Sequence, residues 1–278
     1  MTSTIMTIAT VSIMTMLGGA VQATPKSFGQ ETHLTNISQA TEQLDLSLLA
    51  KTLTAFLQSD RYQTESQIQL NLRTQASETT IYLQTKTLTQ SGKKFRAEIT
   101  FTQPGEPAKT GNLVVSDGKQ VWIYRSDLKQ YSVTSYEAFQ DTSEWILASM
   151  SSLAFLDFSE QDRQIITDGK LSEQNVLSYI GLSSNSELTG DRRTVNSEVF
   201  YVYNYQNPQD GFTLSAFVQP ATATLKQVQL VGKTQSLNVI FTEKILNRIA
   251  NPNVTVDTFQ FSPPQNAQKV KSLSLIPL

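Results

Sequence analysis

The feature that most constrains this fold is a two-residue alternation of apolar and polar side chains, repeated between turn residues. In residues 62–74, YQTESQIQLNLRT, the side chains of Ile68, Leu70 and Leu72 share one face of an extended chain. Residues 93–104, KKFRAEITFTQP, repeat the alternation. Both segments are therefore expected to be strands with one buried face and one solvated face.

Turn signals divide the rest of the chain into further strands. Asp117-Gly118 suits a tight hairpin because both positions tolerate positive φ, and a second turn is expected at Ser126-Asp127. Other strands are expected at 80–90, 198–207, 211–220, 224–233 and 236–246, with a final short strand ending before Pro263-Pro264. The pattern predicts antiparallel meanders.

Two segments have helical periodicity instead. Residues 45–60 place leucines and a phenylalanine at three- and four-residue intervals, with Asp45 or Ser47 as the N-cap. Residues 141–158 are apolar around most of a helix, with Asp141, Thr142 or Ser143 as the cap. The order predicts an α+β, mainly β protein: one strongly curved antiparallel sheet with a few helices over one face.

The chain is expected to contain one domain. Residues 1–23 are predicted to be a signal peptide with small residues Val21 and Ala23 before the cleavage site; an uncleaved anchor and an internal start are the alternatives. Residues 24–43 are expected to be a polar leader, and 44–278 the single domain. Within it, 157–197 is interpreted as an extended polar connection with room for one strand or short helix.

Composition excludes several classes of function. A net charge of -2 gives no basic surface for nucleic acid, and the absence of cysteine removes thiolate chemistry and lipidation at an N-terminal cysteine. The single histidine, His33, lies in the polar leader, where nothing would orient it in a catalytic triad. Asp157, Glu160 and Asp162 fit no defined cation loop, and a solvated turn is the preferred interpretation. We therefore expect no enzyme activity, no metal and no cofactor.

The remaining signal is the apolar face of the expected sheet. When this face packs against an apolar helix, the two surfaces can form a dry core or can leave a cavity for an acyl chain between them. Periodicity alone does not distinguish these two outcomes.

A resemblance to a known family favours the cavity. Residues 113–132, LVVSDGKQVWIYRSDLKQYS, are similar to the S-D-G-K-x-[LV]-W-x-Y hairpin of the periplasmic outer-membrane lipoprotein carriers, the LolA-like family that includes LolA, LolB and LppX folds. Residues 259–270, FQFSPPQNAQKV, resemble that family's closing F-x-F-x-P-P segment. The resemblance covers roughly 44–156 and 198–270. It implies a half-open antiparallel β-barrel whose concave face is covered by helices acting as a lid.

The resemblance also implies a set of residues that line a lipid-binding cavity. From the sheet these are Ile68, Leu70, Leu72, Leu83, Phe95, Ile99 and Phe101; from the helix they are Ile146, Met150 and Leu153. Trp122 and Tyr124 share one face of their strand and are added as candidates, although the sequence leaves open which face. The sequence departs from the family where Lys93 and Lys94 replace the Arg-Pro pair that helps to latch the lid.

The function implied by the resemblance is that of a non-enzymatic periplasmic carrier and chaperone. It would shield acyl chains of a lipoprotein or lipid during transport towards the outer membrane. Its partners would be the acylated cargo, an inner-membrane releasing protein and an outer-membrane accepting protein, and a monomer is expected. The alternative is a periplasmic sensor or protein-interaction module on the same fold.

Overall fold

The computed structural model of the chain describes residues 44–102, 111–182, 188–207, 211–233 and 237–276. The expected signal peptide (1–23) and polar leader (24–43), with His33, lie outside the described residues. Among the residues that are described, no helix is both long enough and apolar enough to cross a membrane.

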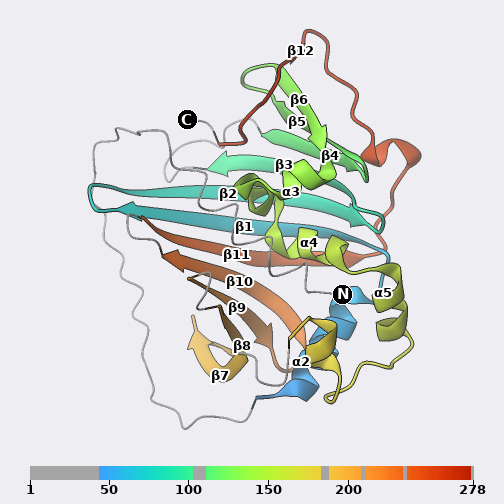
Figure 1. The fold of residues 1–278 in the computed structure, drawn as a ribbon, viewed down its shortest axis with the longest axis vertical. Coiled ribbons are helices and arrows are strands. Elements are labelled where there is room, and N and C mark those ends of the chain that lie inside the picture. The colour runs from blue at the N-terminus through green and yellow to red at the C-terminus, as the bar shows by residue number, and fades with distance from the viewer. Residues whose placement is uncertain (1–43, 103–110, 183–187, 208–210, 234–236, 277–278) are drawn as a thin grey trace.

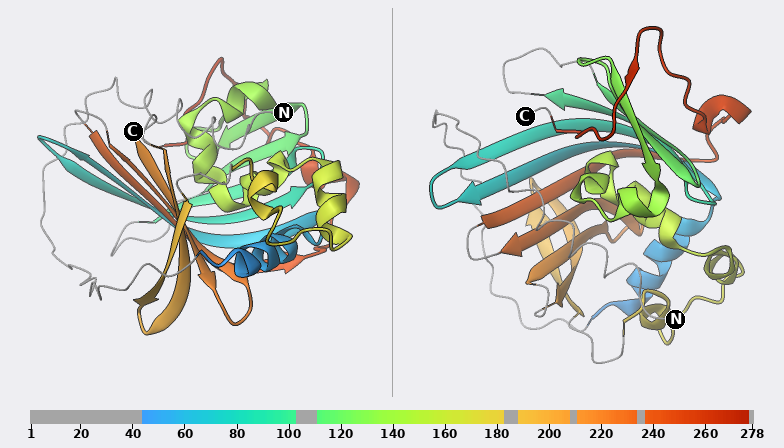
Figure 2. Two further views of the ribbon diagram at one scale, coloured as in Figure 1. Left: turned by 60° about the horizontal axis from the view of Figure 1, so that its bottom comes forward. Right: turned by 45° about the horizontal axis from the view of Figure 1, so that its top comes forward.

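One curved sheet dominates the molecule, with strands in the order β12-β6-β5-β4-β3-β2-β1-β11-β10-β9-β8-β7. Its pairs are antiparallel except for the parallel contact of β12 with β6. The sheet stays unclosed, and the helices lie on its concave side (Figures 1 and 2). This confirms the expected half-open antiparallel barrel. The strand bounds are β1 (Arg61–Thr74), β2 (Glu78–Gln90), β3 (Lys94–Thr102), β4 (Asn112–Asp117), β5 (Gln120–Arg125), β6 (Gln130–Ser135), β7 (Leu188–Val195), β8 (Glu198–Asn207), β9 (Phe212–Gln219), β10 (Thr224–Lys233), β11 (Leu237–Ala250) and β12 (Gln268–Lys269).

The predicted hairpin at Asp117-Gly118 is confirmed and joins β4 to β5. Gly118 has a φ of +101°, and a Cβ there would collide with the carbonyl oxygen of Gly92 in the neighbouring turn. The Asp117 carboxylate accepts hydrogen bonds from the backbone N–H groups of Lys119 and Gln120 at 2.8 Å each. Glycine is therefore required by both conformation and space, and the aspartate fixes the turn.

Helix α2 (Leu46–Leu57) matches the first predicted helix and begins at Asp45, whose carboxylate accepts from Leu48 N. Leu48 and Leu49 of the helix belong to a buried cluster that also includes Tyr201 and Tyr203 of β8. The Tyr201 hydroxyl accepts a hydrogen bond from Asp45 N at 2.9 Å, and the Tyr203 hydroxyl donates to Asp45 O at 2.6 Å. Two tyrosines of β8 therefore fix the start of α2 against the sheet.

The expectation of one continuous helix at 141–158 is wrong. After α3 (Tyr136–Gln140), the chain forms η2 (Ser143–Ala148), α4 (Met150–Ala154) and η3 (Phe155–Asp157). The break falls at Ser149, which has a φ of +86° outside the helical range. Its side chain makes a hydrogen bond to Glu243 of the sheet, as described below. We call residues 143–157 the helical lid.

The polar connection contains more structure than expected. Helices α5 (Glu160–Thr167) and α6 (Val176–Tyr179) precede the edge strand β7. Ile166 and Val176 are fully buried, so each short helix has an apolar anchor. Two acidic residues of this region serve local structure: Asp162 completes a capping box with Ser159, and Asp157 accepts a hydrogen bond from Gln140 Nε2 at 2.7 Å.

The expected strand before Pro263-Pro264 is also wrong. Residues in that region form η4 (Val256–Phe259), whose start is capped reciprocally by the side chains of Thr255 and Thr258. The only strand in the described C-terminal region beyond β11 is the two-residue β12, which follows the prolines. Local hydroxyl caps satisfy backbone groups that a strand would have paired with a neighbour.

Candidate ligand-binding face

The apolar concave face is built from alternate residues of neighbouring strands. In β3, Phe95, Ala97 and Ile99 are fully buried, whereas Glu98 between them is exposed. The register places Leu70 of β1 opposite Phe241 of β11, so the apolar face runs across the centre of the sheet. Period-two patterning therefore produces a continuous apolar surface from segments far apart in the chain.

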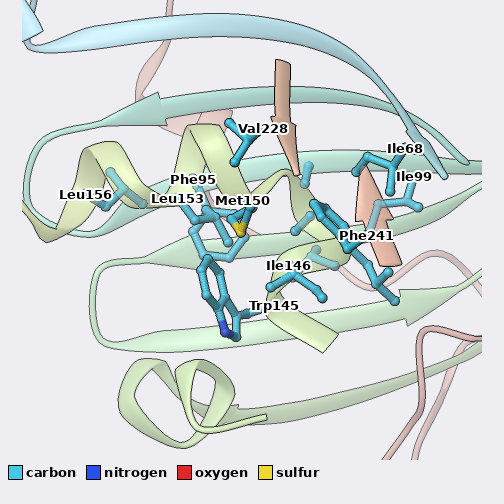
Figure 3. Close-up of a cluster of buried hydrophobic side chains, with 14 of the residues drawn as sticks. Ile68, Phe95, Ile99, Trp145, Ile146, Met150, Leu153, Leu156, Val228 and Phe241 are labelled. Atoms are coloured by element: carbon cyan, nitrogen blue, oxygen red, sulfur yellow. The ribbon is translucent and has the colours of Figure 1, made fainter. Parts of the chain in front are cut away.

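The helical lid supplies the opposing apolar surface. Figure 3 shows side chains of the lid directed toward strand side chains of β1, β3, β10 and β11. The lid residues of this buried cluster are Trp145, Ile146, Leu147, Ala148, Met150, Leu153, Phe155 and Leu156. Sheet and lid therefore bury one another through apolar contacts.

The structure brings together most of the predicted lining residues. Nine of them are buried members of one cluster with exposed fractions of 8% or less: Ile68, Leu70, Leu83, Phe95, Ile99, Phe101, Ile146, Met150 and Leu153. Leu72 is partly buried and packs against the edge of the cluster. These ten residues therefore belong to, or pack against, the same buried cluster as the lid.

Trp122 and Tyr124 are not part of that group. In β5 it is Val121 and Ile123 that face the concave side and enter the cluster. Trp122 and Tyr124 alternate with them and pack around Phe261, with ring centroids 6.4 and 6.2 Å from its ring. The sequence V-W-I-Y is apolar on both faces, which is why periodicity could not orient it.

The concave face changes from apolar to hydroxyl-rich beneath the lid. Along β1 the inward positions pass from Leu70 and Ile68 to Ser66 and Thr64, and on β2 Thr85 and Thr87 continue this polar zone. The Thr87 hydroxyl donates to Ala148 O in the lid at 3.0 Å. The lid is thus attached to the sheet by hydrogen bonds as well as apolar packing.

A buried carboxylate forms the centre of this attachment. Glu243 of β11 is 0% exposed and accepts hydrogen bonds from Ser66 Oγ (2.8 Å), Ser149 Oγ (2.6 Å), Ser151 Oγ (2.8 Å) and Ser151 N (2.8 Å). A buried carboxylate is tolerated only when its oxygens are satisfied in this way. We call these four residues the Glu243 clasp.

Sequence reasoning missed the Glu243 clasp, although one signal was present. Glu243 falls at the inward position of a strand whose other inward residues include Val239, Phe241 and Ile245. A carboxylate in phase with an apolar face requires buried partners. The serines that supply them lie in distant segments of the sequence, and the positions of Ser149 and Ser151 depend on the bend at Ser149.

A cation and aromatic cluster fixes the end of the lid near α2. The Arg248 guanidinium lies against the rings of Phe56 and Tyr62, with its Cζ 3.9 and 4.0 Å from their centroids. Burial lowers the pKa of Arg248 to about 10, because removal from water disfavours the charged form. Arg163 of α5 stacks on Phe155 of the lid at 4.6 Å. Such contacts join α2, α5, the lid and the sheet.

One acidic side chain of the lid has a strongly altered pKa. Burial raises the pKa of Asp157 to about 6, while its hydrogen bond from Gln140 and the charge of Lys93 act in the opposite direction. Burial also raises the pKa of the nearby Tyr136. Across the described parts of the chain, no group of three or more His, Cys, Asp or Glu side chains is placed to hold a metal ion.

Comparison with known proteins gives structural neighbours only. No protein-family model and no curated protein sequence matches the chain. Solved structures similar to it include an uncharacterized conserved protein from Thermus thermophilus, with 14% identity, coverage of 81% of this chain and 97% of that one, and a TM-score of 0.43. Another is a LolA superfamily protein from Nitrosomonas europaea, with 9% identity, coverage of 77% and 98%, and a TM-score of 0.30. A third is MucB in the Pseudomonas aeruginosa MucA/MucB complex, with 12% identity, coverage of 79% and 62%, and a TM-score of 0.35.

Proposed function

We propose that this protein is a non-enzymatic carrier that holds acyl chains of a lipoprotein or lipid between the concave sheet face and the helical lid. It would act in the periplasm, after export through the N-terminal segment, and deliver its cargo towards the outer membrane. The main support is the pairing of two apolar surfaces, one on the sheet and one on a lid built from short helices. The signal peptide, the monomeric state and the releasing and accepting partners belong to the same proposal.

The chemistry of lipid transport explains why such a pair of surfaces is useful. An acyl chain gains about 0.8 kcal/mol for each CH₂ removed from water, so a carrier must bury it in an internal apolar space. Lid and sheet already bury each other, and contacts with the chain can replace part of that mutual contact. The exchange keeps net affinity low enough for the cargo to be released.

The division of the concave face into two zones suits this exchange. The lid is bonded at the hydroxyl-rich zone through the Glu243 clasp and Thr87. Leu72 and Ile81, at the other end of the β1–β2 pair, are only partly buried. We infer that the acyl chain enters at this apolar end while the clasp keeps the lid attached.

Native mass spectrometry with lipid extraction tests the proposal. The protein is purified from the periplasm without detergent, and a delipidated sample is then titrated with palmitate. Co-purified acylated species and saturable palmitate uptake are expected. A lipid-free protein that also fails to take up palmitate would contradict the carrier function and favour a partner-binding module.

Matched leucine variants locate the binding surface. Leu72→Asn places a polar group at the proposed entry end, whereas Leu246→Asn makes the same change at a side chain of β11 that is 51% exposed and lies outside the buried cluster. We expect about tenfold weaker palmitate binding for the first variant only, corresponding to about 1.4 kcal/mol. Equal affinities for both variants would place the ligand elsewhere.

A further inference from the structure

The C-terminal segment of the chain returns to the concave side and buries one leucine there. Beyond β12 the residues at 271, 272 and 274 are exposed, but the side chain of Leu275 is 0% exposed. Leu275 belongs to the same buried cluster as Ile146 and Met150 of the lid, and Leu273 and Ile276 pack against it. The interior proposed for an acyl chain therefore also contains a side chain of this terminal segment.

Polar side chains hold the main chain on both sides of that leucine. Asn112 Nδ2 donates to Leu275 O at 2.7 Å, and Leu275 N donates to the Glu144 carboxylate at 3.1 Å. Arg125 Nη1 donates to the carbonyl oxygens of Ser274 and Ile276 at 3.4 Å each. These contacts hold the backbone of a segment that has no regular secondary structure.

The three holding residues come from different parts of the fold. Asn112 lies in β4, Arg125 ends β5, and Glu144 lies in η2 of the lid. Arg125 is itself fixed by Asp127, whose carboxylate accepts from its Nε at 3.2 Å and its Nη2 at 2.6 Å. Residues 272–276, which we call the terminal strap, therefore connect the lid to the sheet at a second place, apart from the Glu243 clasp.

We propose that the terminal strap is a built-in competitor of the ligand, with Leu275 occupying interior space that an acyl chain takes over when it binds. The inference rests on the proposed carrier function and adds a regulation to the same site. Protein interiors are close-packed, so the leucine and a ligand chain cannot fill the same volume. The strap has no regular secondary structure, so its release breaks side-chain contacts such as those of Asn112 and Glu144 rather than the pairing of a strand or helix.

Displacement has a clear consequence for affinity. If the strap occupies the interior most of the time, the apparent affinity for an acyl chain is the intrinsic affinity multiplied by the small fraction of molecules in which the strap is released. Weakening the strap should therefore strengthen ligand binding. Because Glu144 belongs to the lid, strap release and lid movement should occur together.

Hydrogen exchange on the full-length protein, with palmitate as the probe, tests the competition. Saturating palmitate is expected to increase deuterium uptake in a peptide covering 272–278. Leu275→Ala should bind palmitate about fivefold more tightly than wild type. The matched control is Val256→Ala, since Val256 precedes the strap and is 84% exposed; its affinity should equal that of wild type.

The outcomes separate this inference from the proposed function. Palmitate binding with unchanged exchange at 272–278, or with no gain in affinity for Leu275→Ala, would overturn the competitor role and leave the carrier intact. No palmitate binding by any variant would overturn the carrier and the competition together. If Leu275→Ala does not fold, Glu144→Gln weakens the strap from the partly buried lid side, and the same gain in affinity is expected.

Discussion

The Ser149 hydroxyl donates a hydrogen bond of 2.6 Å to the Glu243 carboxylate, and so joins the bend of the lid to the centre of the sheet. The positive φ of Ser149 ends η2 just where the chain must turn toward β11. A hydrogen bond has a preferred distance and angle between donor and acceptor. The contact therefore sets the position of the lid more firmly than apolar packing, which is non-directional, could do alone.

Removal of the carboxylate should loosen the lid. We expect Glu243→Ala to lower the free energy of unfolding by about 3 kcal/mol, because buried hydroxyl and amide donors lose their acceptor. Urea unfolding gives the stability, and hydrogen exchange should rise most within 143–157. Glu78→Ala, at an exposed position of β2, is the control and should change the stability by less than about 0.5 kcal/mol.

The stability of the fold should depend on pH through Asp157. Its pKa in the folded protein is about 6, above the unfolded value of about 3.9, so protonation favours the folded state. That contribution is complete below about pH 4 and is lost as the pH rises through about 6. Asp157→Asn is neutral throughout and keeps an acceptor for Gln140. The free energy of unfolding of this variant, relative to that of wild type, should therefore be about 2 kcal/mol higher at about pH 8 than at about pH 4.

Urea denaturation of both proteins at the two pH values measures this gain. Asp257→Asn is the control, because Asp257 is exposed in η4. A stability difference between wild type and Asp157→Asn that does not change with pH would show that Asp157 does not titrate in this range.

The tyrosine contacts with the start of α2 should contribute measurably to its attachment. Tyr203→Phe removes the hydroxyl that donates to Asp45 O at 2.6 Å while keeping the ring, so a loss of about 1 kcal/mol is expected. Hydrogen exchange should increase in 44–57. Tyr82→Phe, at a partly exposed position of β2, provides the matched control; an equal loss in both variants would mean that the hydrogen bond adds nothing specific.

The sequence was sufficient where local pattern and tertiary environment agree. Alternation predicted most of the strands and several of their inward residues, including Ile68, Phe95 and Ile99, and Asp45 was correctly among the expected caps of α2. Each of these features is encoded within a few neighbouring residues. These local predictions agree with the structure because the residues that the pattern places on one face are the residues that the core buries.

The sequence was insufficient where distant residues decide the local structure. The bend at Ser149 is stabilised by Glu243, which follows it by 94 residues in the sequence. The sequence of 141–158 taken alone predicts one helix, because it does not contain that partner. The burial of Leu275 likewise depends on Asn112, 163 residues away. The alternation in β11 marks Glu243 as an inward residue but does not identify its partners, so both pairings become visible only in the folded molecule.

The chain contains two tryptophans, and the structure places them in different surroundings, which allows the binding surface to be tested directly. Trp145 belongs to the lid cluster, whereas Trp122 packs on Phe261 away from that cluster. A bromine-labelled fatty acid quenches tryptophan fluorescence only at close range. In Trp122→Phe the remaining Trp145 should be quenched on binding, and in Trp145→Phe the remaining Trp122 should keep its emission. If Trp122 is quenched and Trp145 is not, the fatty acid binds at the outer face of β5 and not between the lid and the sheet.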